Sequence, residues 1–338
     1  MNRLLQSALI ALPLGLLLLP AKAQSPKYPV VESAKHAKYV EKINDMVSFE
    51  MLPIPGGTYL MGSPDDEKGR DANEGPVHPV SVKPFWIAKC EITWDEYDIY
   101  WENRPKGPPP RPKITAKAPP LTDAITSPTP PYEDPTFGFG KDNFPVIAVT
   151  HHAAMEYCRW LSMKTGKAYR LPTEAEWEWA CRAGTTGPYS FDEAKLGEYV
   201  WYEKNAKDMP NKVGQKKPNP WGLFDMNGNV AEWCIDSYQK DFYGTLAKDK
   251  PTLNPFKMPT ADRYPDTARG GSWLDGAEKC RAATRRGSEK GWLKRDPQIP
   301  QSIWWMTEAD WVGFRVVRAV EEDERLKGVR SKVTFWSE

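Results

Sequence analysis

The sequence lacks the local patterns that identify several large enzyme classes. It contains no phosphate-binding P-loop, no GxSxG nucleophile elbow and no dinucleotide fingerprint, and its four histidines include no HExxH pair. No internal repeat and no CxxC pair is present, so the five cysteines do not predict a zinc knuckle. The net charge is +1, and the bases are scattered among the acids. This pattern gives no basis for a nucleic-acid partner.

Residues 1–23 have the form of a secretory signal peptide. Arg3 precedes an apolar run over residues 4–19, and Ala-Lys-Ala ends the segment as a small-x-small cleavage site. A membrane helix is the alternative, but the run is short and is interrupted by polar residues and a proline. We therefore expect an exported chain, periplasmic or secreted, with no membrane span after cleavage. Disulfides persist in such a compartment.

Composition predicts a core of large aromatic residues held by irregular connections. The chain has 15 Trp, 33 Pro and 24 Gly. Its length allows two domains or one large irregular domain. We expect a polar lead-in at 24–48, helical or loose, a domain at 49–320 and a charged tail at 321–338. Eleven prolines between residues 105 and 135 predict an extended surface insertion within 102–143. A solvated loop is favoured there over a polyproline segment that binds a partner.

Capping patterns predict the helices. Thr150 precedes a run with apolar residues at one-face spacing, which ends at Gly166. The Thr173-x-x-Glu176 pattern is a capping box for a second helix, which stops at Gly184. A third Thr-x-x-Glu pattern begins at Thr93. These signals place helices directly after residues 93, 150 and 173.

The stretch GLFDMNGNVAEWC, residues 222–234, has two interpretations. Asn227, Gly228 and Asn229 tolerate left-handed backbone, which predicts a tight turn. Asp225 and Glu232 flank that turn, and carboxylates together with turn carbonyls make an all-oxygen environment that suits calcium. The sequence therefore predicts a turn, a calcium site or both.

Three further groups of residues are candidates for chemistry. His151, His152 and Glu156 have spacing compatible with metal ligation, but an exposed helix start with ordinary polar residues is the favoured interpretation. The arginines near the C-terminal strands are expected to be mainly structural. A set of tryptophans either lines a peptide or glycan groove or belongs to the core. The arginines are Arg269, Arg281, Arg285, Arg286 and Arg315, and the tryptophans are Trp273, Trp292, Trp304, Trp305 and Trp311.

Five motifs in order resemble the sulfatase-modifying-factor family, that of the formylglycine-generating enzyme. They are IPGGTYLMGS, YRLPTEAEWEWACRAG, GLFDMNGNVAEW, RGGSW and VGFRVVR, and the resemblance covers about residues 49–320. It implies an α+β fold, a single irregular domain related to C-type lectins with little regular secondary structure. It also implies the family activity, oxidation of a sulfatase cysteine to formylglycine with oxygen and a copper ion held by two cysteines. Other relatives are noncatalytic modules, so the fold alone does not give the function.

The resemblance carries one metal site over to this chain. The family's calcium site matches Asp225, Gly228, Val230 and Glu232, with side-chain oxygens from the outer two residues and carbonyls from the inner two. Every position keeps an oxygen donor, because Asp225 stands where the family has an amide. The resemblance therefore implies calcium as a structural cofactor.

The expected catalytic segment departs from the family pattern. Ser272 matches the family's serine, but Asp275 stands at the first copper cysteine. Cys280 falls on the second copper position when counted from Ser272, whereas a count back from the downstream arginines places that position at Ala277. Copper(I) requires two soft thiolates, so we expect no copper. A disulfide between Cys280 and Cys234 is a further expectation.

Two functions follow from these observations. The favoured one is an exported binding or scaffold module without redox chemistry, whose ligand is a peptide, a protein or a glycan, with a sulfatase as one candidate partner. The alternative is a formylglycine-generating oxidase, or a related oxygen-dependent enzyme with an altered metal site at Ser272, Asp275 and Cys280.

Overall fold

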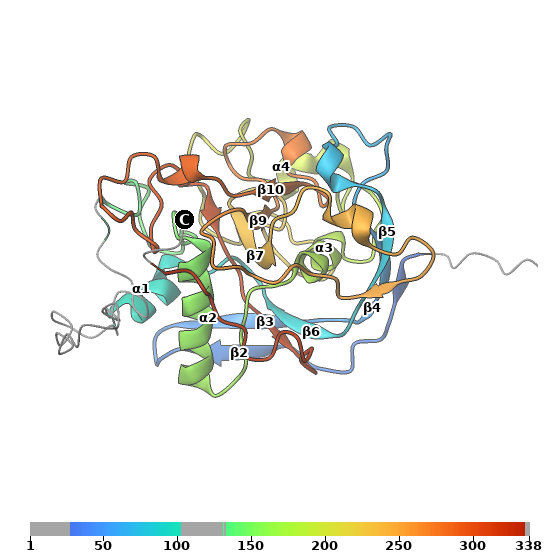
Figure 1. The fold of residues 1–338 in the computed structure, drawn as a ribbon, viewed down its shortest axis with the longest axis horizontal. Coiled ribbons are helices and arrows are strands. Elements are labelled where there is room, and N and C mark those ends of the chain that lie inside the picture. The colour runs from blue at the N-terminus through green and yellow to red at the C-terminus, as the bar shows by residue number, and fades with distance from the viewer. Residues whose placement is uncertain (1–27, 103–130, 132, 335–338) are drawn as a thin grey trace, which may run out of the picture.

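A computed structural model describes residues 28–102, 131 and 133–334, and Figure 1 shows the arrangement of their helices and strands. The expected signal peptide and most of the proline-rich insertion lie outside the described residues. Within them the chain combines three four-stranded sheets with short helices and long connections. This confirms the α+β class and the low content of regular secondary structure.

Each sheet joins strands that are distant in the sequence. The strand orders are β1-β4-β5-β8, β10-β9-β7-β11 and β12-β6-β3-β2. Most neighbouring pairs are antiparallel, but β5 with β8 and β7 with β11 are parallel. The strands are β1 (Val30–Val31), β2 (Tyr39–Lys42), β3 (Ser48–Ile54), β4 (Gly57–Met61), β5 (His78–Val82), β6 (Phe85–Ala88), β7 (Ala231–Ser237), β8 (Thr252–Leu253), β9 (Asp266–Arg269), β10 (Arg285–Gly287), β11 (Val312–Gly313) and β12 (Val317–Ala319).

The segment expected to be a helical or loose lead-in contains two strands instead. β2 pairs antiparallel with β3, with Tyr39 opposite Met51 and Lys42 opposite Ser48. β1 pairs with β4. These strands carry little signal in the sequence because both are short and mostly exposed. The charged tail also packs on the fold, since Leu326 and Val333 are buried.

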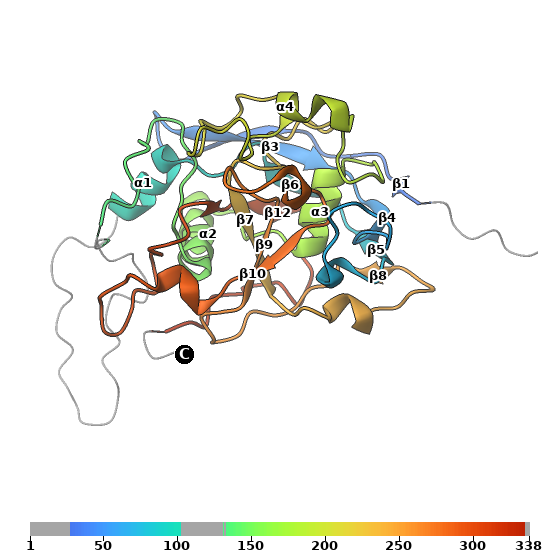
Figure 2. The same cartoon turned by 90° about the horizontal axis from the view of Figure 1, so that it is seen from above.

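The predicted helices are confirmed with their caps. The hydroxyl of Thr150 accepts a hydrogen bond from the Ala153 amide, and Gly166 ends the helix in the left-handed conformation. Thr173 and Glu176 form the predicted capping box. The helices are α1 (Trp94–Glu102), α2 (His151–Thr165), α3 (Glu174–Arg182) and α4 (Leu196–Tyr199). α2 and α3 lie on opposite sides of β7 and β9 (Figures 1 and 2).

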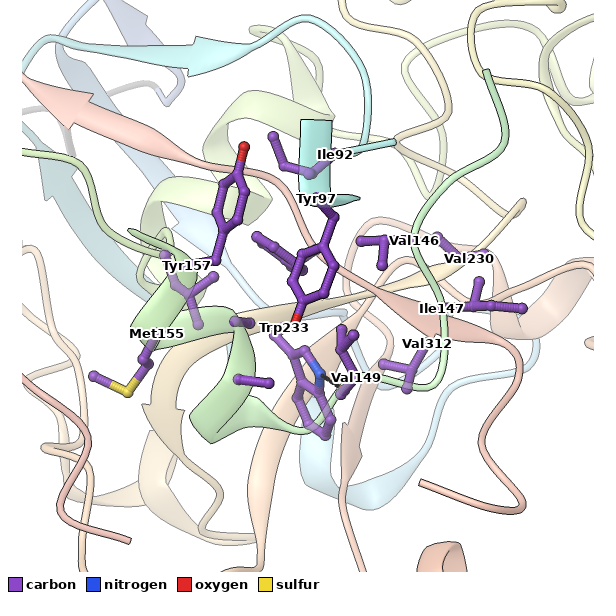
Figure 3. Close-up of a cluster of buried hydrophobic side chains, with 14 of the residues drawn as sticks. Ile92, Tyr97, Val146, Ile147, Val149, Met155, Tyr157, Val230, Trp233 and Val312 are labelled. Atoms are coloured by element: carbon purple, nitrogen blue, oxygen red, sulfur yellow. Dashed lines mark hydrogen bonds between the residues drawn. The ribbon is translucent and has the colours of Figure 1, made fainter. Parts of the chain in front are cut away.

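Large aromatic residues fill the main core, as the composition predicts. Figure 3 shows Tyr97 of α1, Tyr157 of α2 and Trp233 of β7 packed among aliphatic side chains. The rings of Tyr97 and Tyr157 are stacked, with centroids 5.7 Å apart. All five tryptophans whose role the sequence left open belong to this cluster, and none is more than 8% exposed. They are therefore core residues, although Trp292 and Trp305 also contribute to the walls of two small cavities.

Glutamate and arginine pairs are buried throughout the fold. Arg285 donates to both oxygens of Glu174 at 2.6 and 2.9 Å, and Arg170 binds Glu176 in the same bidentate way. A buried charge needs such a partner, because removing either member leaves an uncompensated ion. Four of the five arginines singled out in the sequence therefore have structural roles. The buried pairs are Arg170–Glu176, Arg182–Glu178, Arg269–Glu178, Arg281–Glu74, Arg285–Glu174 and Arg315–Glu232.

Candidate functional site

The loop between β9 and β10 brings the three predicted catalytic residues together. It begins with Gly270 and Gly271, whose φ angles of 97° and 68° require glycine. A Cβ atom on Gly271 would lie 2.5 Å from the Lys279 carbonyl oxygen and 2.9 Å from the Cys280 sulfur. The paired glycines therefore let the loop fold back on itself, so that Cys280 packs against the start of the segment that carries Ser272.

Asp275 is held as a paired anion within this loop. The Ser272 hydroxyl donates to Asp275 Oδ2 at 2.7 Å, and Arg286 Nη2 donates to Asp275 Oδ1 at 2.5 Å. The guanidinium of Arg286 also lies over the Trp311 ring, 4.5 Å from its centroid. Both carboxylate oxygens of Asp275 are thus engaged. The Asp275 carboxylate accepts a hydrogen bond from the Ser272 hydroxyl, and Arg286 balances the negative charge of that carboxylate.

Cys280 is a buried thiol rather than a thiolate. It is fully buried, and burial raises the pKa of the thiol, with the Asp275 charge as the next cause. Its S–H group donates a long hydrogen bond, 3.9 Å, to the Ser272 carbonyl. A thiol whose pKa is raised is a poor nucleophile at neutral pH. Cys280 therefore acts as a small packing residue in this loop.

The donor set at this loop does not fit copper(I). Asp275 stands at the first copper position and its two oxygens bind Ser272 and Arg286, while the second position falls on Cys280 or on Ala277, depending on the end from which the loop is counted. Soft, paired thiolates are what hold copper(I), and this loop has none.

The expected disulfide between Cys234 and Cys280 is wrong for this structure. All five cysteines are free. The two residues occupy different packing environments. Cys234 lies in β7 within a buried cluster that includes Trp177 and Trp179, whereas Cys280 packs against Gly271 in the β9–β10 loop.

The turn at residues 225–232 is confirmed by its backbone. Asp225, Gly228 and Asn229 all have positive φ angles. A Cβ atom on Gly228 would lie 2.1 Å from the Trp201 carbonyl oxygen, so no other residue fits there. Asp225 Oδ2 accepts a hydrogen bond from the Gly214 amide at 2.7 Å, while Oδ1 is buried without a partner. Burial raises the pKa of Asp225 to about 6.

Glu232, which the resemblance implies as a calcium ligand, is already paired with a buried arginine. Arg315 donates to both of its oxygens at 2.5 and 2.6 Å, and Trp177 Nε1 donates to Oε2 at 2.8 Å. A calcium ion at Glu232 would also lie beside a guanidinium of the same sign. The residues present therefore fit an internal ion pair better than calcium.

His151 and His152 are buried, which corrects the expectation of an exposed helix start. One nitrogen of His151 is 2.9 Å from the Cys234 carbonyl oxygen, and His152 Nδ1 is 2.7 Å from the Ser331 hydroxyl. Burial lowers the pKa of His151 to about 4. Glu156 binds Arg159 instead of joining the histidines. The three residues are packing and hydrogen-bonding groups and do not form a metal site.

Sequence reasoning missed Glu91. This residue follows β6, is 2% exposed, and accepts hydrogen bonds from the Asn229 side chain and the Val230 amide. Burial raises its pKa well above the ordinary value, and the neighbouring charge of Asp225 adds to the shift. The sequence around it, IAKCEITWDE, mixes apolar and charged residues and does not reveal the neighbour at Asp225.

Comparisons with known proteins agree with the motifs. A family model described as the sulfatase-modifying factor enzyme 1-like domain matches residues 37–320, which includes the β2 strand. The formylglycine-generating enzyme of Mycobacterium tuberculosis is 28% identical over 286 residues, covering 68% of this chain and 89% of that protein. The inactive Cα-formylglycine-generating enzyme 2 of Bos taurus is also 28% identical, covering 70% and 82%. Overall identity therefore does not separate active from inactive relatives.

Two further relatives extend the comparison. The serine/threonine-protein kinase pkn1 of Chlamydia pneumoniae is 30% identical over 78% of this chain, which spans only 39% of that protein's length. The structure of PvdO from Pseudomonas aeruginosa superposes with a TM-score of 0.60 at 29% identity, covering 85% of this chain and all of that one. On its motifs, its fold and the match over residues 37–320, this chain belongs to the sulfatase-modifying factor, or formylglycine-generating enzyme, family.

Proposed function

We propose that this chain is an exported, non-redox member of the family that binds a partner without oxidising it. The observation that carries the proposal is the state of the β9–β10 loop. Asp275 stands at the first copper position and binds Ser272 and Arg286, and Cys280 is the only cysteine of the loop. A redox site of the family kind needs two thiolates at these positions. The leader at residues 1–23 supports export, and a sulfatase or another peptide, protein or glycan is the candidate partner.

The test uses a sulfatase peptide that contains the Cys-x-Pro-x-Arg sequence. The purified chain is incubated with the peptide, copper and oxygen, and the peptide mass is measured, with the Mycobacterium tuberculosis relative as the positive control. We expect no conversion of cysteine to formylglycine by this chain. Fluorescence polarisation of the labelled peptide measures binding in the same samples. Formylglycine formation above the enzyme-free background would overturn the non-redox proposal.

The second candidate is an oxygen-dependent enzyme with an altered metal site. One observation favours it, namely that Ser272, Asp275 and Cys280 lie in one loop. Competition with a chromophoric copper(I) chelator separates the two candidates. We expect wild type and Cys280→Ser to retain equally little copper(I). A copper ion that wild type holds and Cys280→Ser loses would favour the enzyme.

A further inference from the structure

A cavity between α2 and the C-terminal segment has the size of a small-molecule site. Its volume is about 430 Å³, and sites for small organic molecules have volumes of roughly 300–1,000 Å³. One side of α2, the residues at 168–171, the segment from 322 to 330 and Ile235 of β7 form its walls. No residue of the β9–β10 loop lines this cavity. It is therefore separate from the positions that match the family's catalytic residues.

The inner walls of the cavity are apolar. Cys158 is a free, buried cysteine and acts there as a small apolar group. Met163, which is 66% exposed, adds a flexible thioether at the rim. Such walls suit a hydrocarbon chain. The apolar lining residues that are no more than 7% exposed are Met155, Cys158, Leu171, Ile235 and Leu326.

The uncharged polar groups in the walls already have hydrogen-bond partners. The Ser162 hydroxyl donates to the Cys158 carbonyl at 2.7 Å and accepts from the Tyr169 amide at 2.8 Å. The Tyr169 hydroxyl donates to Glu41, which lies outside the cavity. A peptide segment would bring backbone N–H and C=O groups that need partners when they are buried. The walls therefore favour a ligand whose buried part is hydrocarbon.

The charged residues that line the cavity leave one positive charge without a partner. Four of them are bases and one is an acid, Glu322. Arg330 is exposed and has no acidic partner among the ion pairs of the described residues, whereas the other three bases are paired. Glu156, which also feels the Arg330 charge, is already bound by Arg159. The pairs are Arg159–Glu156, Arg170–Glu176, Arg170–Glu322 and Lys327–Glu324.

The walls and the rim together define the chemistry of the ligand. The apolar interior requires a hydrocarbon body, and the unbalanced guanidinium of Arg330 requires one negative group. A guanidinium matches a carboxylate by two parallel hydrogen bonds. A cationic ligand would meet the same unbalanced charge with the wrong sign.

We propose that this cavity binds a carboxylate on an alkyl chain, the chemistry of a fatty acid. The carboxylate lies at Arg330, and the chain lies along Met155, Leu171 and Leu326. This site goes beyond the proposed non-redox function and does not depend on it, because it shares no residue with the β9–β10 loop.

The experiment is isothermal titration calorimetry on the full chain with four probes. Octanoate and hexanoate carry the proposed group on chains of different length. Octylamine has the octyl chain with a positive charge, and acetate has the carboxylate without the chain. We expect octanoate to bind, hexanoate to bind about tenfold more weakly because two buried methylenes are lost, and the other two probes not to bind.

Two exposed positions allow the proposal to be tested without disturbing the core. Arg330→Gln should weaken octanoate binding by about threefold, because an exposed charge pair is lost. Lys332→Gln is its matched control, since this exposed base belongs to the same segment and does not line the cavity. Met163→Glu places a negative charge at the rim and should weaken binding by a similar factor. Met46→Glu is the control for that change, since Met46 is 90% exposed and lies outside the cavity.

Three results would overturn the proposal. The first is octanoate binding that is no tighter than that of acetate, hexanoate or octylamine. The second is an unchanged octanoate affinity in either Arg330→Gln or Met163→Glu. The third is an equal loss of affinity in a cavity variant and its matched control. The peptide assay for the non-redox function is read separately, so failure of one proposal leaves the other standing.

Discussion

Substitution of Arg315 by methionine should strongly destabilise the fold. The side chain is fully buried, donates to both oxygens of Glu232, and also binds the carbonyl oxygens of Ala88 at 3.1 Å and Phe224 at 3.0 Å. In Arg315→Met the Glu232 carboxylate stays buried with only the Trp177 indole as a donor. Breaking a buried pair by removing one partner costs about 3–5 kcal/mol. For a chain of this size that is a fall in Tm of about 4–7 °C.

The assay is thermal unfolding followed by circular dichroism at pH 7, with two comparisons. Glu232→Gln combined with Arg315→Met should be more stable than Arg315→Met alone, because it removes the unpaired charge. Lys217→Met breaks an exposed pair with Glu198 and should leave the Tm almost unchanged. A Tm for Arg315→Met within about 2 °C of wild type would refute the reasoning.

The same thermal unfolding assay also tests whether the chain binds calcium at Glu232. If Glu232 is neutralised by Arg315, calcium added after chelation should leave the wild-type Tm unchanged. If calcium instead raises the Tm of wild type and restores that of Arg315→Met, Glu232 is a calcium ligand. The set Asp225, Gly228, Val230 and Glu232 would then be reinstated as a metal site.

Two other substitutions test the turn and a buried histidine. Gly228→Ala should destabilise by at least about 1–3 kcal/mol in urea unfolding, because it combines a left-handed φ of 83° with a clash at the Trp201 carbonyl. Gly166→Ala, with φ 71° and open space around it, should cost less; equal costs would contradict the clash. The folded-state pKa of His151, about 4, lies below its ordinary value of 6.5, so its contribution to stability is present above pH 6.5 and is lost as the pH falls to 4. His151→Gln should therefore lose about 3 kcal/mol less than wild type between pH 7 and pH 4, and an identical loss would exclude His151 as the cause.

Local signals in the sequence predicted the helices well. The side chains of Thr150, Thr173 and Glu176 hydrogen-bond to backbone groups within a few residues of themselves. These helix caps can therefore be recognised from the local sequence. The strands at Val30–Val31 and Tyr39–Lys42 were missed for the opposite reason. Their pairing with β4 and β3 is what makes them strands, and short exposed segments carry little periodic signal.

The candidate site was predicted in part. The sequence singled out Ser272, Asp275 and Cys280, and the structure places them in one loop. It did not predict that Arg286 would bind Asp275, although that arginine had been noted in a set expected to be mainly structural. Glu91 was missed altogether, because its raised pKa arises from burial and from Asp225, which is distant in the sequence.

The sequence by itself determined the family, the class of fold, the helix ends and the tight turn at 225–232, because motifs and caps are local. Only the tertiary structure decided which charges meet. In the folded chain Glu232 pairs with Arg315, Asp225 Oδ1 has no partner, and the thiol of Cys280 is buried. The physical reason is that pairing and desolvation depend on residues that are distant along the chain and adjacent only after folding.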